Sequence, residues 1–517
     1  MKFHPLGSAF YKLATGRSGW RDLNICEQET SHDDTVIVRK SLLNIVHISD
    51  THLCDAQSPA RVEYLDRFAD PHHPLAALIG SLIGTYRAQE VLTAQVFESM
   101  VKAINSIDRT PITHSEVDLV LITGDLTDNA QKNELSWFTT LAQGGALRPD
   151  SGSHEKWEGA GAEFYSPHFW NPHGTPAGEE DDFPRKLYGF PEIPELLDAV
   201  RQPFQATGFS HPWLAVHGNH DALLQGTVLP DETLRAMATS NSKIMELSDS
   251  EAISALAQVT EIGPARYPLP TTPTEIRVTA DSERDFVLPS AWNHSFPSVY
   301  SATEGKYWRK DFDFITILAI DTVNPFGGWQ GSLDRQQFTW LQSQIESLDN
   351  RFVVITSHHP LEDLINGYTP ESQPRVLRGE VEEYLLSKSH VIAWICGHTH
   401  KHRITHFGPD ESTGFWQIET ASLIDWPQQG RVIEIFLDDN DRICIGSTVF
   451  DHAGEVCNEF GAVRLDDIAH LAGLSRVIAL NDWQRRDGDF RIELNEGIEK
   501  DQNVILVKPI PASVQIK

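Results

Sequence analysis

Short apolar runs alternate along the chain with longer segments in which apolar residues recur at helical spacing. The runs resemble buried strands of a parallel sheet, because they are largely apolar and end at turn-forming or polar residues. The predicted strands are 42–48, 119–123, 213–216, 314–320, 352–356, 391–396, 415–418, 432–437 and 504–507. The predicted helices are 92–107, about 130–142, 231–247, 250–259, 334–348 and 468–482. Strands that alternate with helices predict an α/β fold.

Two long stretches interrupt this alternation and lack a regular pattern, at about 144–205 and 226–310. We interpret them as insertions in one principal domain over 41–450, since long irregular loops in compact folds are more often functional than linking. Residues 1–40 are expected to form an N-terminal arm, and 451–517 a C-terminal extension packed on the core. The aromatic segments 157–188 and 324–329 either cover a site or simply pack the long loops.

Charge and cysteine usage restrict the partners and the compartment. The chain has 42 Lys and Arg against 73 Asp and Glu, a formal charge of −31. This charge opposes binding to nucleic acid or to an anionic membrane, so we expect neither partner. No apolar run is long enough to cross a bilayer, and the N-terminus lacks the apolar region of a secretory signal. The odd number of scattered cysteines is typical of reduced thiols, and we expect a cytoplasmic protein without a thiolate zinc site. The cysteines are Cys26, Cys54, Cys396, Cys444 and Cys457.

Potential metal ligands follow five of the predicted strands. Each has an ordinary explanation by itself: Asp125 suits the first turn of a helix, and Asn219 suits a turn. Their joint occurrence at five strand ends is improbable by chance, and such ends meet where ligands bind in α/β sheets. Carboxylate, amide and imidazole groups suit Mn, Fe or Zn. The residues are Asp50 and His52, Asp125, Asn219 with His220, His358, and His398 with His400.

The same residues lie in an ordered series of motifs. These are DTH at 50–52, GDLTD at 124–128, GNHD at 218–221, SHHP at 357–360 and GHTH at 397–400. The series resembles the calcineurin-like metallophosphoesterases, over roughly residues 42–440, and stretches such as SLDRQQFTWLQ look like a bacterial subgroup of that superfamily. The resemblance implies a four-layer α/β/β/α sandwich with mixed sheets and a binuclear metal centre.

The resemblance also implies how two metal ions would be held. One ion would be bound by Asp50, His52, Asp125 and His400, and the other by Asp125, Asn219, His358 and His398, so that Asp125 bridges them. His359 is an alternative to His358. Asp128 stands where purple acid phosphatases have a metal-bound tyrosine, so we expect no tyrosinate-to-iron colour. The identity of the metal pair stays open among Mn, Fe and Zn.

The resulting hypothesis is hydrolysis of a small phosphorylated substrate, a mono- or diester, by a hydroxide bridging two metal ions. His220 is expected to donate a hydrogen bond or proton to the leaving group, and Asp221 to fix its tautomer. Arg61 either binds the phosphate or is an ordinary ion-paired arginine. The alternatives are a non-catalytic metal- or phosphate-binding module, a structural metal site, or a nuclease of the same superfamily. The oligomeric state stays open.

Overall fold

The computed structural model describes most of the chain, and the statements below concern that part. It describes residues 3–6, 10–13, 36–79, 83–161, 164–258, 262–267, 269–288, 292, 307–348, 350–410, 413–456, 460–487 and 495–515. Most of the expected N-terminal arm lies outside these ranges, as do Cys26 and Cys457. Its described pieces are the antiparallel strands β1 (Phe3–Leu6) and β2 (Phe10–Leu13).

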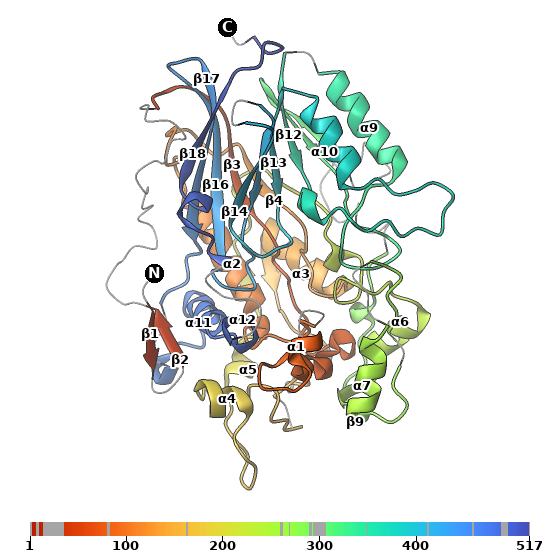
Figure 1. Cartoon of the computed structure of the whole chain (residues 1–517). Helices are drawn as coiled ribbons and strands as arrows, with labels where there is room; N and C mark the ends of the chain where they lie inside the picture. Colours follow the sequence, from red (N-terminus) through yellow and green to blue (C-terminus); the bar gives the residue numbers. More distant parts are fainter. Residues whose placement is uncertain are drawn as a thin grey trace.

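Two six-stranded mixed sheets form the centre of the fold (Figure 1). In the first sheet the order is β10 (Trp308–Asp311), β11 (Ile315–Ala319), β12 (Phe352–Thr356), β13 (Val391–Cys396), β15 (Phe415–Glu419) and β14 (Arg403–Phe407). In the second it is β18 (Val504–Pro509), β17 (Arg442–Asp451), β16 (Gln429–Asp438), β3 (Val38–Ile48), β4 (Leu119–Ile122) and β7 (Trp213–Ala215). Strands β11, β12, β13 and β15 are parallel to one another, as are β3, β4 and β7, and the remaining pairings in both sheets are antiparallel.

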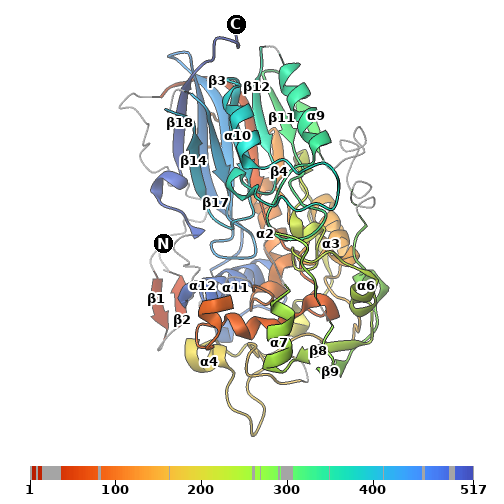
Figure 2. The ribbon, with the colours of Figure 1, turned by 45° about the vertical axis from the view of Figure 1, so that its right-hand side comes forward.

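Alternating side chains of the first sheet enter two different cores. Ile317 belongs to the large core shared with the second sheet, whereas Leu318 belongs to a core shared with α9 (Arg335–Glu346) and α10 (Arg378–Leu386). Helices α2 (Thr93–Asn105) and α3 (Lys132–Gln143) cover the second sheet, and α11 (Ile468–Leu480) packs beside α2 (Figure 2). The layers are therefore helix, sheet, sheet and helix, which confirms the predicted sandwich.

The insertions and helix α11 of the C-terminal extension gather at one end of the sheets, whereas β18 of that extension belongs to the second sheet (Figure 1). The first insertion, with α4 (Phe183–Tyr188) and α5 (Leu196–Ala199), shares an apolar cluster with α11. The second, with α6 (Glu232–Ala238) and α7 (Asp249–Leu256), packs on the short helices η1 (Pro59–Arg61) and η2 (Glu63–Ala69). No helix among the described residues is long and apolar enough to span a membrane.

One predicted helix is wrong in its second half. The pattern over 231–247 predicts continuous helix, but α6 ends at Ala238 and β8 (Ser242–Glu246) follows, paired with β9 (Thr274–Arg277). Ser240 and Asn241 interrupt the helix, and buried Lys243 is held by a 2.6 Å ion pair with Glu63. The sequence pattern also missed α10, β14 and β17. In α10 the buried residues are only Val381 and Leu385, so its apolar stripe is narrow.

A buried carboxyl group joins the C-terminal extension to the segment around η2. Asp70 accepts hydrogen bonds from Trp483 Nε1 at 2.5 Å and Gln484 Nε2 at 3.1 Å, at the start of α12 (Trp483–Asp487). Burial raises the pKa of Asp70 to about 7, against the opposing effect of these two hydrogen bonds. A carboxyl group whose pKa is higher in the folded chain favours the fold at low pH and loses that contribution as the pH rises through the folded pKa.

We expect Asp70→Asn to remove this loss of stability at neutral pH. The amide oxygen still accepts both hydrogen bonds, but the side chain never has to be charged in its buried position. The melting temperature of the variant should exceed that of the wild type by about 2 °C at pH 8 and by less at pH 5. Exposed Asp108→Asn is the control, and an equal difference at both pH values would contradict the argument.

Candidate metal centre

The predicted ligands meet between the two sheets, at the carboxyl ends of five parallel strands. Three loops leave the second sheet after β3, β4 and β7, and two leave the first sheet after β12 and β13. Main-chain hydrogen bonds fix neighbouring loops, for example His52 N to the oxygen of Asp125 at 2.9 Å. The residues brought together in this way are Asp50, His52, Asp125, Asn219, His358, His398 and His400.

A glycine precedes three of these seven ligands, Asp125, Asn219 and His398, because the loops approach more closely there than a side chain allows. A Cβ on Gly124 would lie 2.7 Å from His358 Nδ1, and one on Gly218 would overlap the carboxylate of Asp125. The φ of Gly218 is −108°, which any residue adopts, so the close contact alone requires glycine there. The dipeptides GD, GN and GH in the sequence indicate where the loops approach each other closely. A search for metal ligands alone does not use these glycines.

The ligand loops also hold non-glycine residues in the left-handed region of backbone space. The φ angles are 52° at Asp50, 43° at His52, 48° at Asp125, 70° at His398 and 58° at His400. Such conformations are uncommon for residues with a Cβ and are concentrated at functional sites, where the surrounding structure holds them. The fold therefore accepts local strain in order to direct these side chains toward one point.

Two groups of metal-binding atoms share Asp125. In the first group His52 Nε2 lies 3.2 Å from His400 Nε2, which is itself 3.4 Å from Asp50 Oδ1. In the second, His358 Nε2 lies 2.8 Å from Asn219 Oδ1 and 3.2 Å from His398 Nδ1. Asp125 Oδ2 reaches both groups, at 3.6 Å from His52 Nε2 and 3.2 Å from His358 Nε2.

The imidazole rings present lone pairs to these two points. In three rings the opposite nitrogen is a hydrogen-bond donor: Nδ1 of His52 lies 3.0 Å from Asp128 Oδ1, Nδ1 of His400 2.5 Å from Asp425 Oδ2, and Nδ1 of His358 2.8 Å from the oxygen of Thr123. When these rings are neutral, their inward nitrogens therefore carry lone pairs directed at other acceptors. A cation satisfies such an arrangement, and oxygen with imidazole nitrogen is a suitable ligand set for borderline metals.

The carboxylates of the centre are held in their charged form. Burial alone would raise the pKa of Asp125, but the neighbouring His358 and His220 outweigh it and hold that pKa well below its usual range. Burial opposes the charged form of His358 as well, yet Asp125 raises the pKa of this ring to about 9. The centre thus already favours positive charge next to Asp125.

Of the two adjacent histidines, His358 faces the centre. Both ring nitrogens of His359 are engaged elsewhere, Nδ1 with the hydroxyl of Thr322 at 2.7 Å and Nε2 with the carbonyl of Trp329 at 2.9 Å. His359 therefore anchors the loop that contains Trp329, while His358 offers Nε2 to a metal.

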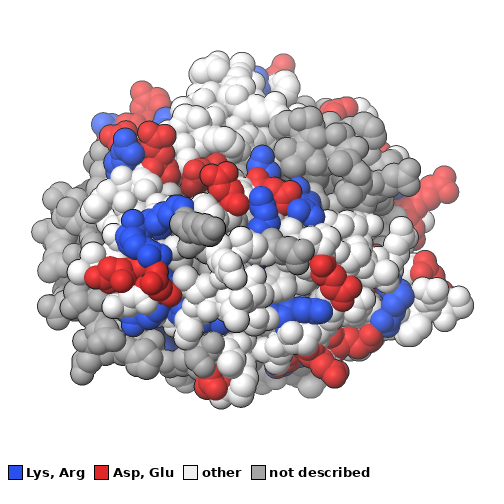
Figure 3. Space-filling model, turned by 90° about the horizontal axis from the view of Figure 1, so that it is seen from above, with Lys and Arg blue, Asp and Glu red and all other residues white. Residues whose placement is uncertain are grey.

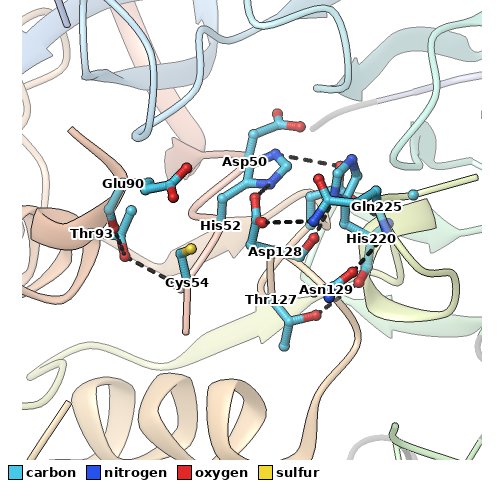
Figure 4. Close-up of polar contacts among 12 residues, drawn as sticks. Asp50, His52, Cys54, Glu90, Thr93, Thr127, Asp128, Asn129, His220 and Gln225 are labelled. Atoms are coloured by element: carbon cyan, nitrogen blue, oxygen red, sulfur yellow. Dashed lines mark hydrogen bonds and ion pairs between the residues drawn. The ribbon is translucent and has the colours of Figure 1, made fainter. Parts of the chain in front are cut away.

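Asp128 supports two histidines, and Arg61 supports Asp128. The Asp128 carboxylate binds His52, its main-chain oxygen lies 2.6 Å from His220 Nδ1, and Figure 4 shows it between these two rings. Arg61 is 1% exposed and forms ion pairs with Asp128 and, at 2.6 Å, with Glu90. The expected contact of Arg61 with a phosphate is therefore wrong: its guanidinium is enclosed by carboxylates and does not line the cavity described below.

Asp425 holds the ring of His400 in the first group of ligands. Asp425 was not identified from the sequence. Besides His400, its carboxylate binds Arg87 Nε at 2.8 Å and the Arg485 guanidinium at 2.5 Å. Burial would raise the pKa of Asp425, but Arg485 and Arg87 hold it far below its usual range. These residues are distant in sequence and belong to no motif, so only the fold reveals their association.

His220 lies where the sequence placed it, but Asp221 does not orient its ring. Asp221 Oδ1 accepts from the main-chain nitrogens of Leu126 and Thr127, at 2.9 and 3.0 Å, and so ties two ligand loops together. The carbonyl of Asp128 instead receives the Nδ1 proton of His220, which leaves Nε2 of the neutral ring as the acceptor. The prediction that Asp221 fixes the tautomer is corrected accordingly.

A cavity of about 410 Å³ opens above the metal ligands. Asp125, Asn219, His220, His398 and His400 form part of its lining. The second insertion and the C-terminal extension line it too, whereas the described residues of the aromatic segment 157–188 do not. Trp329 is the residue of segment 324–329 at the cavity, so the predicted aromatic cover is reduced to one side chain.

We expect Gly218→Ala to weaken metal binding because its Cβ would displace the Asp125 carboxylate. Calorimetric titration with Mn²⁺ should show an affinity at least about tenfold lower, in the range known for disturbed ligand positions. Gly379→Ala is the matched control, since Gly379 lies in helix α10 with open space around it. Unchanged Mn²⁺ binding by Gly218→Ala would show that the close packing of the loops does not determine the ligand geometry.

The comparisons with known proteins differ in strength. None of the curated proteins matches the chain. The solved structures that resemble it include a purple acid phosphatase from yellow lupin (Lupinus luteus) seeds, which is 9% identical and is matched over 79% of this chain and 52% of that chain. They also include a putative 5'-nucleotidase from Staphylococcus aureus, which is 10% identical and is matched over 84% of this chain and 58% of that chain. The TM-score is 0.30 in both cases. The chain thus spans little more than half the length of either, and likenesses this weak carry no argument. The model of the family described as calcineurin-like phosphoesterase matches residues 43–402, and the chain belongs to this family.

Proposed function

We propose that the chain hydrolyses a mono- or diester of phosphoric acid, with a small organic substrate and two metal ions at the centre described above. The observation that carries the proposal is the convergence of two groups of acceptor atoms, joined by Asp125, on the floor of one cavity. Family membership gives phosphoester hydrolysis in general, and the geometry supports the binuclear form of it.

The two ions would have separate ligand sets with one shared member. Asp50, His52 and His400 would hold the first, while Asn219, His358 and His398 would hold the second. Asp125 would bridge them, since one carboxylate oxygen lies within 3.6 Å of ring nitrogens from both sets. Nitrogen and oxygen ligands suit Mn, Fe or Zn, and the ligand set does not distinguish among these metals.

Bound in this way, two cations supply an activated water and positive charge for the phosphoryl oxygens. Arg87, Lys401 and Arg485 line the same cavity, but both arginines pair with Asp425, and Asp363 and Asp482 are part of the lining. The metal ions would therefore supply most of the positive charge that favours an anionic substrate in a chain with a charge of −31. Asp128 and Asp425 keep the rings of His52 and His400 in the orientation that binding requires.

We assign to His220 the role of donating a proton to the leaving oxygen. Its Nδ1 proton is held by the carbonyl of Asp128, so protonation at Nε2 gives a cation that donates into the cavity. Burial lowers the pKa of His220 well below its usual value, which makes that cation a strong acid, and a bound phosphate dianion favours its formation.

A small substrate is a better match than a nucleic acid. On the face seen in Figure 3, described Lys and Arg side chains are interspersed with Asp and Glu rather than gathered into a stripe. Nucleic-acid binding depends on a continuous basic track along the phosphate backbone. The charge of −31 and the dispersed charges on this face therefore support a small phosphoester.

We expect the Mn-loaded protein to hydrolyse p-nitrophenyl phosphate or its bis ester, and His220→Ala to lose most of this activity. Acid catalysis contributes about 100- to 10,000-fold, so kcat should fall by that factor while metal content stays at the wild-type level. Near wild-type turnover in His220→Ala would remove this residue from the mechanism. Metal binding by the wild type without hydrolysis of either ester, under several metals, would favour the non-catalytic binding module.

We expect matched substitutions of the two carboxylates of the GDLTD motif to differ in metal stoichiometry. Asp125→Asn removes the charge of the proposed bridge and should leave less than one bound metal ion per chain. Asp128→Asn keeps an oxygen for His52 and should retain the second ion, with the first weakened by about 10- to 100-fold. Elemental analysis after dialysis measures both. Retention of two ions by Asp125→Asn would exclude the bridging role.

A further inference from the structure

One wall of the cavity above the metal centre is apolar. We call it the apolar wall and define it by seven side chains that line the cavity and belong to a single hydrophobic cluster, separate from the core between the sheets. They are Val62, Leu65, Ile83, Leu224, Val228, Leu256 and Tyr267. They come from three segments: the segment between β3 and α2, the loop after His220, and the second insertion.

Other residues that line the cavity are charged. They are Arg87, Lys401 and Arg485 with Asp363 and Asp482, and the proposed metal ligands Asn219 and His400 also form part of the lining. A ligand that satisfies all of these surfaces has an anionic group on the metal centre and an apolar group directed at the apolar wall. The volume of about 410 Å³ admits an organic group of drug-like size.

The apolar wall is built from constrained positions. Val62 joins η1 to η2 with φ 50° and ψ 27°, a left-handed conformation that is a genuine outlier for a β-branched residue. Strained residues of this kind are concentrated at functional sites. The hydroxyl groups of Tyr267 and Tyr64 are hydrogen-bonded to each other, so the polar group of Tyr267 has a partner and its ring supplies apolar surface.

We propose that the apolar wall binds the hydrophobic organic group of the substrate, so that the protein acts on phosphoesters of apolar alcohols or phenols. This inference rests on the proposed function, because it takes the phosphoryl group to lie at the metal centre. The driving force is transfer of apolar surface out of water, which scales with the area buried. Substrates whose organic group is small or strongly polar gain nothing from this wall.

Two aryl phosphates test the inference. Phenyl phosphate and 4-tert-butylphenyl phosphate release phenols of similar acidity, so a difference in kcat/KM reports the apolar group and not the chemistry of the leaving oxygen. We expect kcat/KM to be about tenfold higher for the tert-butyl compound, since an added apolar group in a fitting pocket is worth at least that factor. Equal values for the two esters would overturn the proposal.

Three variants test whether the apolar wall causes the preference for the tert-butyl ester. Val228→Thr keeps the shape of the side chain and adds a hydroxyl, and Leu256→Ala removes apolar surface. Both should lower the tert-butyl to phenyl ratio toward one. Ile253→Ala is the matched control, because Ile253 lies on the same helix α7 but is 46% exposed, and its ratio should equal that of the wild type. A wild-type ratio retained in both Val228→Thr and Leu256→Ala would place the apolar site elsewhere and overturn the assignment.

Binding of the corresponding phosphonates separates this inference from the proposed function. Phenylphosphonate and 4-tert-butylphenylphosphonate are not hydrolysed, and calorimetry of the metal-loaded protein measures their affinities directly. Tighter binding of the tert-butyl compound, weakened in Val228→Thr, supports the apolar wall even if no ester is turned over, in which case only the proposed hydrolysis fails. Equal affinity of the two phosphonates would overturn the apolar wall whether or not esters are hydrolysed.

Discussion

Lone pairs that face one another inside a protein repel unless positive charge lies among them, and the centre of this structure depends on that constraint. His52 and His400 approach to 3.2 Å between their inward nitrogens, and His358 and His398 to the same distance. Hydrogen bonds on the outer nitrogens of His52, His400 and His358 direct the lone pairs of the neutral rings inward. The arrangement suits bound cations, and the stability of the fold would be coupled to their binding.

Holding these groups together requires support from segments that are distant in sequence. Asp128 and Asp425 each fix an inward-facing histidine, and each is itself held by arginines: buried Arg61 in one case, buried Arg87 and half-buried Arg485 in the other. Breaking a buried ion pair leaves an uncompensated charge, so these arginines stabilise the carboxylates on which the ligands depend. Because Arg485 belongs to the C-terminal extension, that extension is part of the support of the centre. Its strand β18 also completes the second sheet.

The sequence predicted the features that are local and missed those created by contact between distant segments. The strand ends and their ligands could be identified because each consists of a few adjacent residues with a recognisable pattern. The association of Asp425 with His400, or of Arg61 with Asp128, is not encoded in any such pattern, and Arg61 was accordingly given a contact with phosphate that the fold does not allow. The error at β8 has the same origin: Ser242–Glu246 is a strand because β9 lies beside it.

The residues proposed for the chemistry and those proposed for substrate preference lie on different parts of the fold. The proposed metal ligands lie on loops of the two central sheets, where the strand directions bring them together. The apolar wall comes from the segment between β3 and α2, the loop after His220 and the second insertion, while the charged lining residues come mainly from that first segment, the loop after β13 and the C-terminal extension. Changes in the apolar wall would alter what fills the cavity without moving the strand ends, since the wall has a hydrophobic cluster of its own. In the proposed function, the metal centre therefore stays constant while the preference for an organic group changes.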